Sequence, residues 1–307
     1  MENRSVKAGI VGAGVFGGFH ASKYSAHAQT DLVGVFDPDI DRARVLADKH
    51  GAQAFDTLEH MLAEVDVVTV ACPAVHHFAA AAAALASGKH VLVEKPIASS
   101  VEEARELINL ASSHGCVLQV GHQERFVFQA MGLLEVPEVP KRIVARRMGP
   151  PSDRNLDVSV TLDLMVHDLD LVIALAGAPI KSVEGKTDAG RFGSPDVAEA
   201  TLVFENGCVA ELISSRVHHE RDRKMHVAYE TGVLDIDFVA KTFENSTPYA
   251  LNADFAETET ARDSLGANVN AFIASVIEGA PVAVPGIAGL RALDAARAVD
   301  GEREYGS

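Results

Sequence analysis

A glycine-rich turn between an apolar run and an amphipathic stretch is the feature that most constrains this chain. The run Val6–Val11 is predicted to form a strand, and Val15–Ala26 has the pattern of a helix. Glycine suits the turn between them, because the chain bends tightly there and its amides can approach a pyrophosphate at the helix N-terminus. The pattern predicts a dinucleotide site formed by Gly12, Gly14, Val15, Phe16 and Gly17. An ordinary strand-to-helix turn is the alternative.

The rest of the first third alternates β-branched runs with amphipathic stretches. This rhythm is typical of βαβ units, and it predicts an α/β fold that begins with a doubly wound parallel sheet. The further predicted strands are Asp31–Phe36, Val65–Ala71, Val91–Val93 and Val117–Val120, and the predicted helices are Asp39–His50, His76–Ser87 and Val101–His114.

The pattern changes after about residue 122. Successive strands without intervening helices predict a second, mostly antiparallel sheet. These strands are Lys141–Met148, Val183–Thr187, Ala198–Phe204, Cys208–Ser215, Lys224–Tyr229 and Val233–Phe238. Asn206-Gly207 is a strong hairpin signal between two of them. Helices are expected at Leu162–Ala176, Ser264–Glu278 and Gly286–Val299.

The charge balance narrows the classes of partner. The 307 residues include 27 Lys and Arg against 43 Asp and Glu, a formal net charge of −16, so broad contact with nucleic acid or an anionic membrane is not expected. An anionic small molecule would need a local basic pocket. Two segments could supply that pocket: Lys141, Arg142, Arg146, Arg147 and Arg154, then Arg216, Arg221, Arg223 and Lys224. The alternative is that these basic residues lie on solvated strand edges.

Targeting and cysteine signals are weak. No run approaches the roughly 20 apolar residues of a membrane helix, and the N-terminus lacks the apolar core of a signal peptide. A cytoplasmic protein is therefore expected. Cys72, Cys116 and Cys208 are odd in number and far apart, so neither a disulfide framework nor a zinc site is indicated.

Asp37 ends the second predicted strand, about 20 residues beyond the glycine turn, where dinucleotide-binding folds place a carboxylate. A carboxylate there accepts hydrogen bonds from the adenosine ribose and repels a ribose phosphate, which favours NAD over NADP. A helix cap or turn role for Asp37 is the alternative.

Glu94-Lys95-Pro96 follows a predicted strand at the edge where open α/β sheets bind ligands. A lysine there can donate to a substrate hydroxyl and take part in proton transfer. Pro96 fixes the backbone direction, and a cis bond is open to it. The alternative is a surface lysine before a turn. Cys72-Pro73, followed by His76-His77, ends the neighbouring strand and faces the same edge, unless these histidines only begin a surface helix.

Asp163, His167 and Asp170 lie on the expected helix of the second sheet region. Asp163 and His167 are four residues apart and therefore neighbours on one helix face, a spacing suited to acid–base chemistry. A helix cap with a buried core histidine is the alternative, and matching metal-ligand spacing is found nowhere else, so no metal is expected. Arg125 follows Gly121-His122 at the predicted domain junction and could grip substrate or form a structural salt link.

Taken together and in order, these motifs resemble one family, the glucose-fructose oxidoreductase / inositol dehydrogenase family (Gfo/Idh/MocA). The resemblance covers nearly the whole chain. Its motifs are the glycine turn, Cys72-Pro73 with His77, the run from Gly88 to Pro96, Asp163 with His167, and the stretch that begins Asn270-Ala-Phe272.

The resemblance implies a Rossmann domain over residues 1–122 and an α/β domain with a large, mostly antiparallel open sheet over 123–285. It also implies that a helix in 286–307 returns to pack on the first domain. The implied reaction is hydride transfer from a sugar or polyol carbinol to NAD, with Lys95, Asp163 and His167 as catalytic residues. We predict His167 as general base, Lys95 as the group that polarises the alkoxide, and Asp163 as the group that orients substrate or His167; Lys95 remains a second candidate for the base.

Several further expectations follow from the resemblance. The predicted cofactor contacts are the glycine-turn residues with Asp37, Cys72, Pro73, His77, Glu94 and Lys95. Val120–Phe126 and Asp163–Asp170 look most similar to UDP-N-acetylglucosamine 3-dehydrogenases, although Val127-Phe128 stands where many of these have Asn-Pro. Arg125 and Arg147 are then expected to bind a diphosphate. A free-sugar or inositol dehydrogenase and a non-catalytic NAD-binding protein are the alternatives, and a homodimer or homotetramer is expected.

Overall fold

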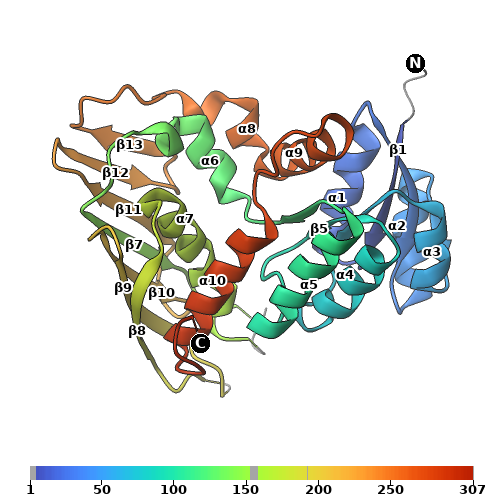
Figure 1. The fold of residues 1–307 in the computed structure, drawn as a ribbon, viewed down its shortest axis with the longest axis horizontal. Helices are drawn as coiled ribbons and strands as arrows, with labels where there is room; N and C mark the ends of the chain where they lie inside the picture. The colour runs from blue at the N-terminus through green and yellow to red at the C-terminus, as the bar shows by residue number, and fades with distance from the viewer. Residues whose placement is uncertain (1–4, 153–157, 192, 307) are drawn as a thin grey trace. The chain divides into compact units, whose positions relative to one another are not determined.

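The computed structural model describes residues 5–152, 158–191 and 193–306. The chain forms two compact units. The first unit contains Met1–Gln123 and Asp263–Leu290, and the second contains Glu124–Arg262 and Arg291–Ser307. Each unit has its own sheet (Figure 1).

The first unit is a six-stranded parallel sheet in the order β3-β2-β1-β4-β5-β6. The order reverses between β1 and β4, which makes the sheet doubly wound and creates a ligand-binding switch point at the carboxyl ends of these strands. The strands are β1 (Val6–Val11), β2 (Thr30–Phe36), β3 (Gln53–Phe55), β4 (Val67–Val70), β5 (His90–Val93) and β6 (Leu118–Val120).

Helices cover both faces of this sheet (Figure 1). One layer contains α1 (Val15–Ala26), α2 (Ile40–His50) and α9 (Ser264–Glu278), and the other contains α3 (Leu58–Glu64), α4 (His77–Ala86) and α5 (Val101–His114). Local sequence sets their ends. Ser100 and Glu103 form a capping box at the start of α5, and Gly115 ends the same helix in the left-handed conformation.

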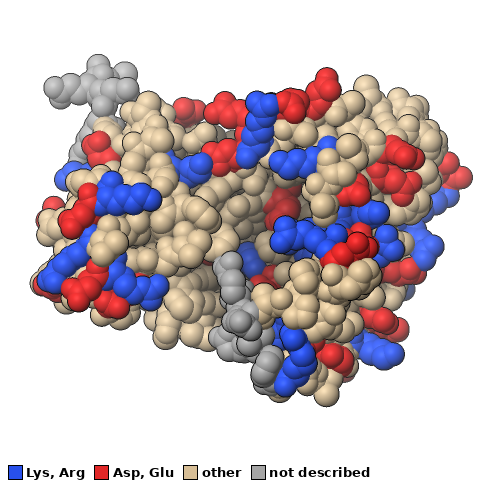
Figure 2. Space-filling model, turned by 180° about the vertical axis from the view of Figure 1, so that it is seen from behind, with Lys and Arg blue, Asp and Glu red and all other residues tan. Residues whose placement is uncertain are grey.

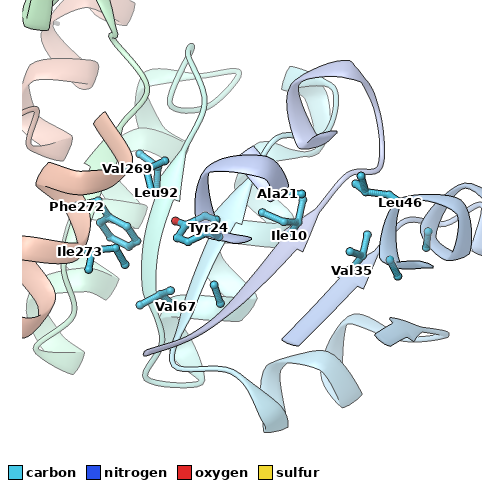
Figure 3. Close-up of a cluster of buried hydrophobic side chains, with 13 residues drawn as sticks. Ile10, Ala21, Tyr24, Val35, Leu46, Val67, Leu92, Val269, Phe272 and Ile273 are labelled. Carbon is cyan, nitrogen blue, oxygen red and sulfur yellow. The ribbon is translucent and has the colours of Figure 1, made fainter. Parts of the chain in front are cut away.

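A buried cluster holds α9 to the first unit. Val269, Phe272 and Ile273 of α9 pack with residues of β1, α1, β4 and β5, among them Tyr24 and Leu92 (Figure 3). The expected domain boundaries instead place residues 263–285 with the second sheet. The division differs because an amphipathic helix belongs to whichever unit buries its apolar side, which chain order does not specify.

The second unit is a seven-stranded sheet in the order β13-β12-β11-β7-β10-β9-β8. Every pairing is antiparallel except that of β7 with β10, which is parallel. The strands are β7 (Arg142–Met148), β8 (Ile180–Thr187), β9 (Val197–Phe204), β10 (Val209–Ser215), β11 (Asp222–Ala228), β12 (Val233–Asp237) and β13 (Thr242–Asn245). The expected α/β fold class, with a doubly wound parallel sheet and a mostly antiparallel second sheet, is confirmed.

The predicted hairpin is present at Asn206-Gly207. Gly207 has a positive φ of 87°, and the Asn206 side chain accepts the amide of Cys208 at 3.2 Å. Asparagine and glycine therefore supply the conformations that a tight turn between β9 and β10 requires.

Helix α7 (Val166–Ala176) is continuous with a π-helical turn at Thr161–Met165, and most of α7 is buried. Helix α6 (Glu124–Met131) and the short α8 (Glu259–Arg262) also belong to this unit. Helix α10 (Gly286–Val299) divides: its start packs on Leu118 and Ile108 of the first unit, whereas the rest belongs to the second. The expectation placed the whole segment 286–307 on the first domain.

Acidic and basic side chains are interspersed on the face of the molecule shown in Figure 2. Among the described residues, no helix has both the length and the apolar character needed to cross a bilayer.

Candidate active site

The glycine turn of the first unit leaves no room for side chains at two positions. Gly12 has a φ of +100°, and a Cβ placed on it would lie 2.7 Å from the amide nitrogen of Cys72. A Cβ on Gly17 would lie 1.8 Å from the Gly12 carbonyl oxygen. Gly14 stands at the N-cap of α1, where it adds no side chain in front of the helix amides. This backbone cradle fits a pyrophosphate.

Asp37, one residue beyond β2, is bound to that turn. Its Oδ2 accepts the amide of Ala13 at 2.7 Å, and its Oδ1 accepts the amide of Asp39 at 3.0 Å. The carboxylate therefore has a structural role in ordering the turn, and each oxygen still has a lone pair for a ribose hydroxyl. This position fits NAD, and its role in cofactor binding stays a prediction.

Glu94, directly after β5, is a buried carboxylate. Its Oε1 lies 2.7 Å from Nε2 of the fully buried His20. Burial by itself raises the pKa of Glu94, but the His20 hydrogen bond and the nearby charges of His20 and Lys95 outweigh it, so that the net pKa is lowered. A Cβ on Gly121 would lie 2.8 Å from the Glu94 carboxylate, which would have to shift to make room for it. Glu94 is therefore engaged by His20 in the core, and its role in cofactor binding stays a prediction.

Lys95 is half-buried at the end of β5, and the Lys95–Pro96 peptide bond is cis. His77, at the start of α4, joins this segment to the end of β4. Its Nδ1 lies 2.7 Å from the Pro96 carbonyl oxygen, and its Nε2 lies 2.9 Å from that of Cys72. Burial lowers the pKa of His77, which favours the neutral ring; that ring can donate to only one of the two carbonyls at a time. Burial also raises the pKa of the Cys72 thiol to about 11.

The predicted catalytic residues of the second unit lie on and before α7. His167 and Asp163 are both half-buried on a segment whose other residues are mostly buried. Asp163 lies in the π-helical turn, which changes the angular spacing of its residues relative to an α-helix. The contact that the structure shows for His167 Nδ1 is with Oε2 of Glu124, at 2.6 Å. π turns of this kind are frequent at functional sites.

Glu124, the first residue of α6, is a candidate site residue that the sequence pattern does not single out. Its other oxygen, Oε1, accepts a hydrogen bond from Arg147 Nη1 at 3.0 Å. Arg147 also binds Asp168 with two bonds, at 2.9 and 2.8 Å, and its side chain is only 3% exposed. Burial opposes the charge of Arg147, but the carboxylates of Asp168 and Glu124 raise its pKa above the ordinary value. Glu124 is therefore held as a carboxylate between a guanidinium and an imidazole.

Arg125 forms a bidentate pair with Asp170, with both bonds at 2.7 Å. Asp170 is 1% exposed, and this pair is a structural salt link between α6 and α7, the alternative role expected for Arg125. Arg125 and Arg147 are thus both engaged by carboxylates of their own unit, and Arg147 has almost no exposed guanidinium. These contacts do not favour the expected role of either arginine as a diphosphate ligand. Arg154 lies outside the described residues.

Within residues 5–152, 158–191 and 193–306, no group of three His, Cys, Asp or Glu side chains is arranged to hold a metal ion.

Comparison with known proteins decides the family. Residues 6–122 match the oxidoreductase family with an NAD-binding Rossmann fold, GFO/IDH/MocA, and residues 143–235 match the GFO/IDH/MocA C-terminal domain. The chain is also 36% identical over 300 residues to the UDP-N-acetylglucosamine 3-dehydrogenase of Acidithiobacillus ferrooxidans, with 95% of each chain covered. The protein belongs to the GFO/IDH/MocA oxidoreductase family.

A solved structure and one further relative support the assignment of this protein to the GFO/IDH/MocA family. A solved structure of the A. ferrooxidans enzyme superposes with a TM-score of 0.89 at 36% identity, covering 97% of both chains. The D-glucoside 3-dehydrogenase of Escherichia coli is 31% identical over 265 residues, which are 75% of this chain and 76% of the relative. Membership of this NAD-binding family agrees with the cradle at Gly12–Gly17 and with Asp37.

Proposed function

We propose that this protein oxidises a secondary hydroxyl of a nucleotide sugar, such as the 3-hydroxyl of UDP-N-acetylglucosamine, with NAD as the hydride acceptor. The observation that carries the proposal is the contact of half-buried His167 with Glu124, a carboxylate that Arg147 fixes in place. The proposed substrate is supported by the 36% identity to the A. ferrooxidans enzyme.

The hydrogen bond at Nδ1 sets the chemistry of His167. Glu124 is held as a carboxylate and can only accept, so Nδ1 carries the proton and Nε2 of the neutral ring keeps its lone pair. We assign Nε2 as the base that takes the proton of the sugar hydroxyl. The negative charge of Glu124 then stabilises the imidazolium that forms, as an orienting carboxylate does for other catalytic histidines.

Bound NAD supplies the hydride acceptor for the carbinol carbon. Gly12, Gly14 and Gly17 with the start of α1 would hold its pyrophosphate, and Asp37 its adenosine ribose. We assign Lys95 the hydrogen bond that stabilises the developing alkoxide and Asp163 the orientation of substrate. Cys72, Pro73 and His77 would line the cofactor at the end of β4.

A second candidate, the oxidation of a free sugar or glycoside, is favoured by the 31% identity to D-glucoside 3-dehydrogenase. The same side chains would perform it, because the proton and the alkoxide are the same in both reactions. The two candidates differ in the charged diphosphate, which only the nucleotide sugar carries.

NADH absorbance separates these candidates. Purified protein receives NAD with UDP-N-acetylglucosamine, with a methyl glucoside or with inositol, and a carbonyl trap draws off the ketone. We expect the highest kcat/KM with the UDP-sugar. Faster turnover of the uncharged sugars would favour the second candidate, and normal NAD binding without turnover of any of them would leave a non-catalytic protein.

The outer face of the second sheet supports the proposal of a homo-oligomer. An open groove there is lined by Val144, Thr201 and Ile213 together with charged residues, and Val144 and Ile213 remain partly exposed. Ile213→Lys is expected to yield monomers in light scattering, whereas Val239→Lys, at an exposed residue of the same unit, is not. A wild-type monomer would contradict the proposal.

A further inference from the structure

A small cavity in the second unit carries more positive than negative charge. It has a volume of about 120 Å³, and its charged lining residues are Glu124, Arg147, Arg223 and Lys241. Glu124 pairs with Arg147 and also accepts a hydrogen bond from His167, and the charge of Arg147 is compensated by Asp168 and Glu124. The positive charge that remains belongs to Arg223 and Lys241.

The register of β7 and β11 places Arg223 directly opposite Arg147. Residues opposite each other in an antiparallel pair project from the same face, and like charges at such positions destabilise the sheet. The next pair, Arg146 and Lys224, is also basic, but each member has its own carboxylate partner: Asp222 for Arg146 and Asp237 for Lys224.

Arg223 has no such partner among the residues that the structure describes. Its Nε is shielded from solvent without a hydrogen-bond acceptor there. Burial lowers the pKa of its guanidinium below the ordinary value, and repulsion from Arg147 acts in the same direction. A half-buried guanidinium with an unmet donor is costly unless an anion completes it.

Lys241 is held at the cavity by a strained turn. Among the described residues it is the one non-glycine residue with a positive φ, at 56°. Asp237 Oδ1 fixes the turn, because it accepts the amides of Val239 and Ala240 at 2.9 Å each. Backbone strain of this kind persists where surrounding structure enforces it, often at ligand sites. Phe238 and Phe255 form apolar walls of the cavity, which strengthen electrostatic attraction inside it.

From this arrangement we infer that the cavity is a phosphate subsite in which Arg223 and Lys241 bind a phosphoryl group of the substrate. The identity of the ligand rests on the proposed function, since a nucleotide sugar carries phosphoryl groups and a free sugar carries none. Arg147 acts as a positioning residue that holds Glu124. The subsite would therefore distinguish nucleotide sugars from free sugars, and Glu124 would connect it to His167.

The test uses Arg223→Gln and Lys241→Gln, with Arg221→Gln as a control that removes a nearby exposed charge outside the cavity lining. Two readouts are needed: kinetics with UDP-N-acetylglucosamine and a methyl glucoside, and calorimetric binding of UDP at saturating NAD. Saturating NAD prevents UDP from occupying the cofactor cradle. Thermal melting identifies any variant that fails to fold, and the second variant then carries the test.

We expect Arg223→Gln to raise KM for the UDP-sugar and Kd for UDP by about ten- to a hundredfold, the loss of a charge-assisted hydrogen bond. Lys241→Gln should act in the same direction with a smaller effect, because its side chain is exposed. For the glucoside, neither substitution should change kcat or kcat/KM by more than about threefold, because this substrate carries no phosphoryl group. The control Arg221→Gln should resemble the wild type with both substrates.

Wild-type affinity for UDP in folded Arg223→Gln and Lys241→Gln would overturn the subsite, and so would a wild-type protein that binds neither UDP nor pyrophosphate. If the wild type binds UDP through Arg223 but oxidises no UDP-sugar, the subsite stands and the proposed function fails. If UDP-sugar turnover is normal in both variants, the function stands and the subsite fails.

Discussion

The two units build their polar sites from different groups. In the first unit the cradle consists of backbone amides at Gly12–Gly17, and a side chain at Gly17 would collide with the Gly12 carbonyl. In the second unit the site is a chain of side chains, in which Arg147 holds Glu124 and Glu124 holds His167. The cradle therefore tolerates no added volume, whereas the network depends on charge. Substitutions of volume and of charge should affect the two units differently.

The largest effect is expected for Gly17→Ala. Its Cβ would lie 1.8 Å from a backbone oxygen that cannot move aside, whereas the adjacent Gly18→Ala would place its Cβ 3.8 Å from Leu46 Cδ1. Because the strain in Gly17→Ala is about 3 kcal/mol, its NAD affinity should fall at least about a hundredfold. The NAD affinity of Gly18→Ala should remain near the wild-type value. Fluorescence titration of NADH measures both, and equal affinities would contradict a cradle made of backbone.

The next largest effect is expected for Glu124→Gln. The amide oxygen of the glutamine can still accept a hydrogen bond from His167 Nδ1. The substitution removes the negative charge that stabilises the imidazolium, and it leaves Arg147 with one carboxylate partner. We expect kcat to fall about tenfold, with unchanged NAD affinity. A fall in NAD affinity without a change in kcat would show that Glu124 serves the cofactor instead of His167.

The smallest effect is a pH dependence of stability from His77. Burial lowers its pKa in the folded protein, so the unfolded chain binds a proton first as pH falls below the ordinary value of 6.5. The contribution of His77 to stability is therefore present above pH 6.5 and is lost as pH falls through the window beneath it. The slope is at most about 1.4 kcal/mol per pH unit. Urea unfolding of His77→Gln between pH 7 and 5 should show a flatter profile than the wild type; parallel profiles would contradict the assignment.

The difference between the backbone cradle of the first unit and the side-chain network of the second also explains which parts of the site could be predicted from the sequence. The glycine turn and Asp37 are separated by a single strand–helix unit, so a local pattern identifies them. Glu124 and His167 are 43 residues apart, and nothing in either local pattern shows that they meet. The sequence pattern predicted a helix over Asp163 and His167, but not the π turn that contains Asp163, whose cause lies in packing beyond the local sequence.

Packing also decided the parts of the fold that the sequence did not predict. The alternation of strands and helices predicted both sheets, because each strand carries its own pattern. The parallel pairing of β7 with β10 and the position of α9 in the first unit depend on which surfaces become buried together. The short β3 and α3 were missed because three and seven residues carry too little periodicity. The charges of Arg125 and Arg147 were evident, but their carboxylate partners were not.

The central claim is that His167, held by Glu124, takes the proton of a nucleotide-sugar hydroxyl. The direct measurement is kcat for NADH formation from UDP-N-acetylglucosamine in the wild type and in His167→Gln, with NAD affinity measured on the same preparations. The account predicts a fall in kcat of about a hundredfold or more at unchanged NAD affinity, the contribution typical of a positioned general base. Wild-type kcat in His167→Gln would contradict it.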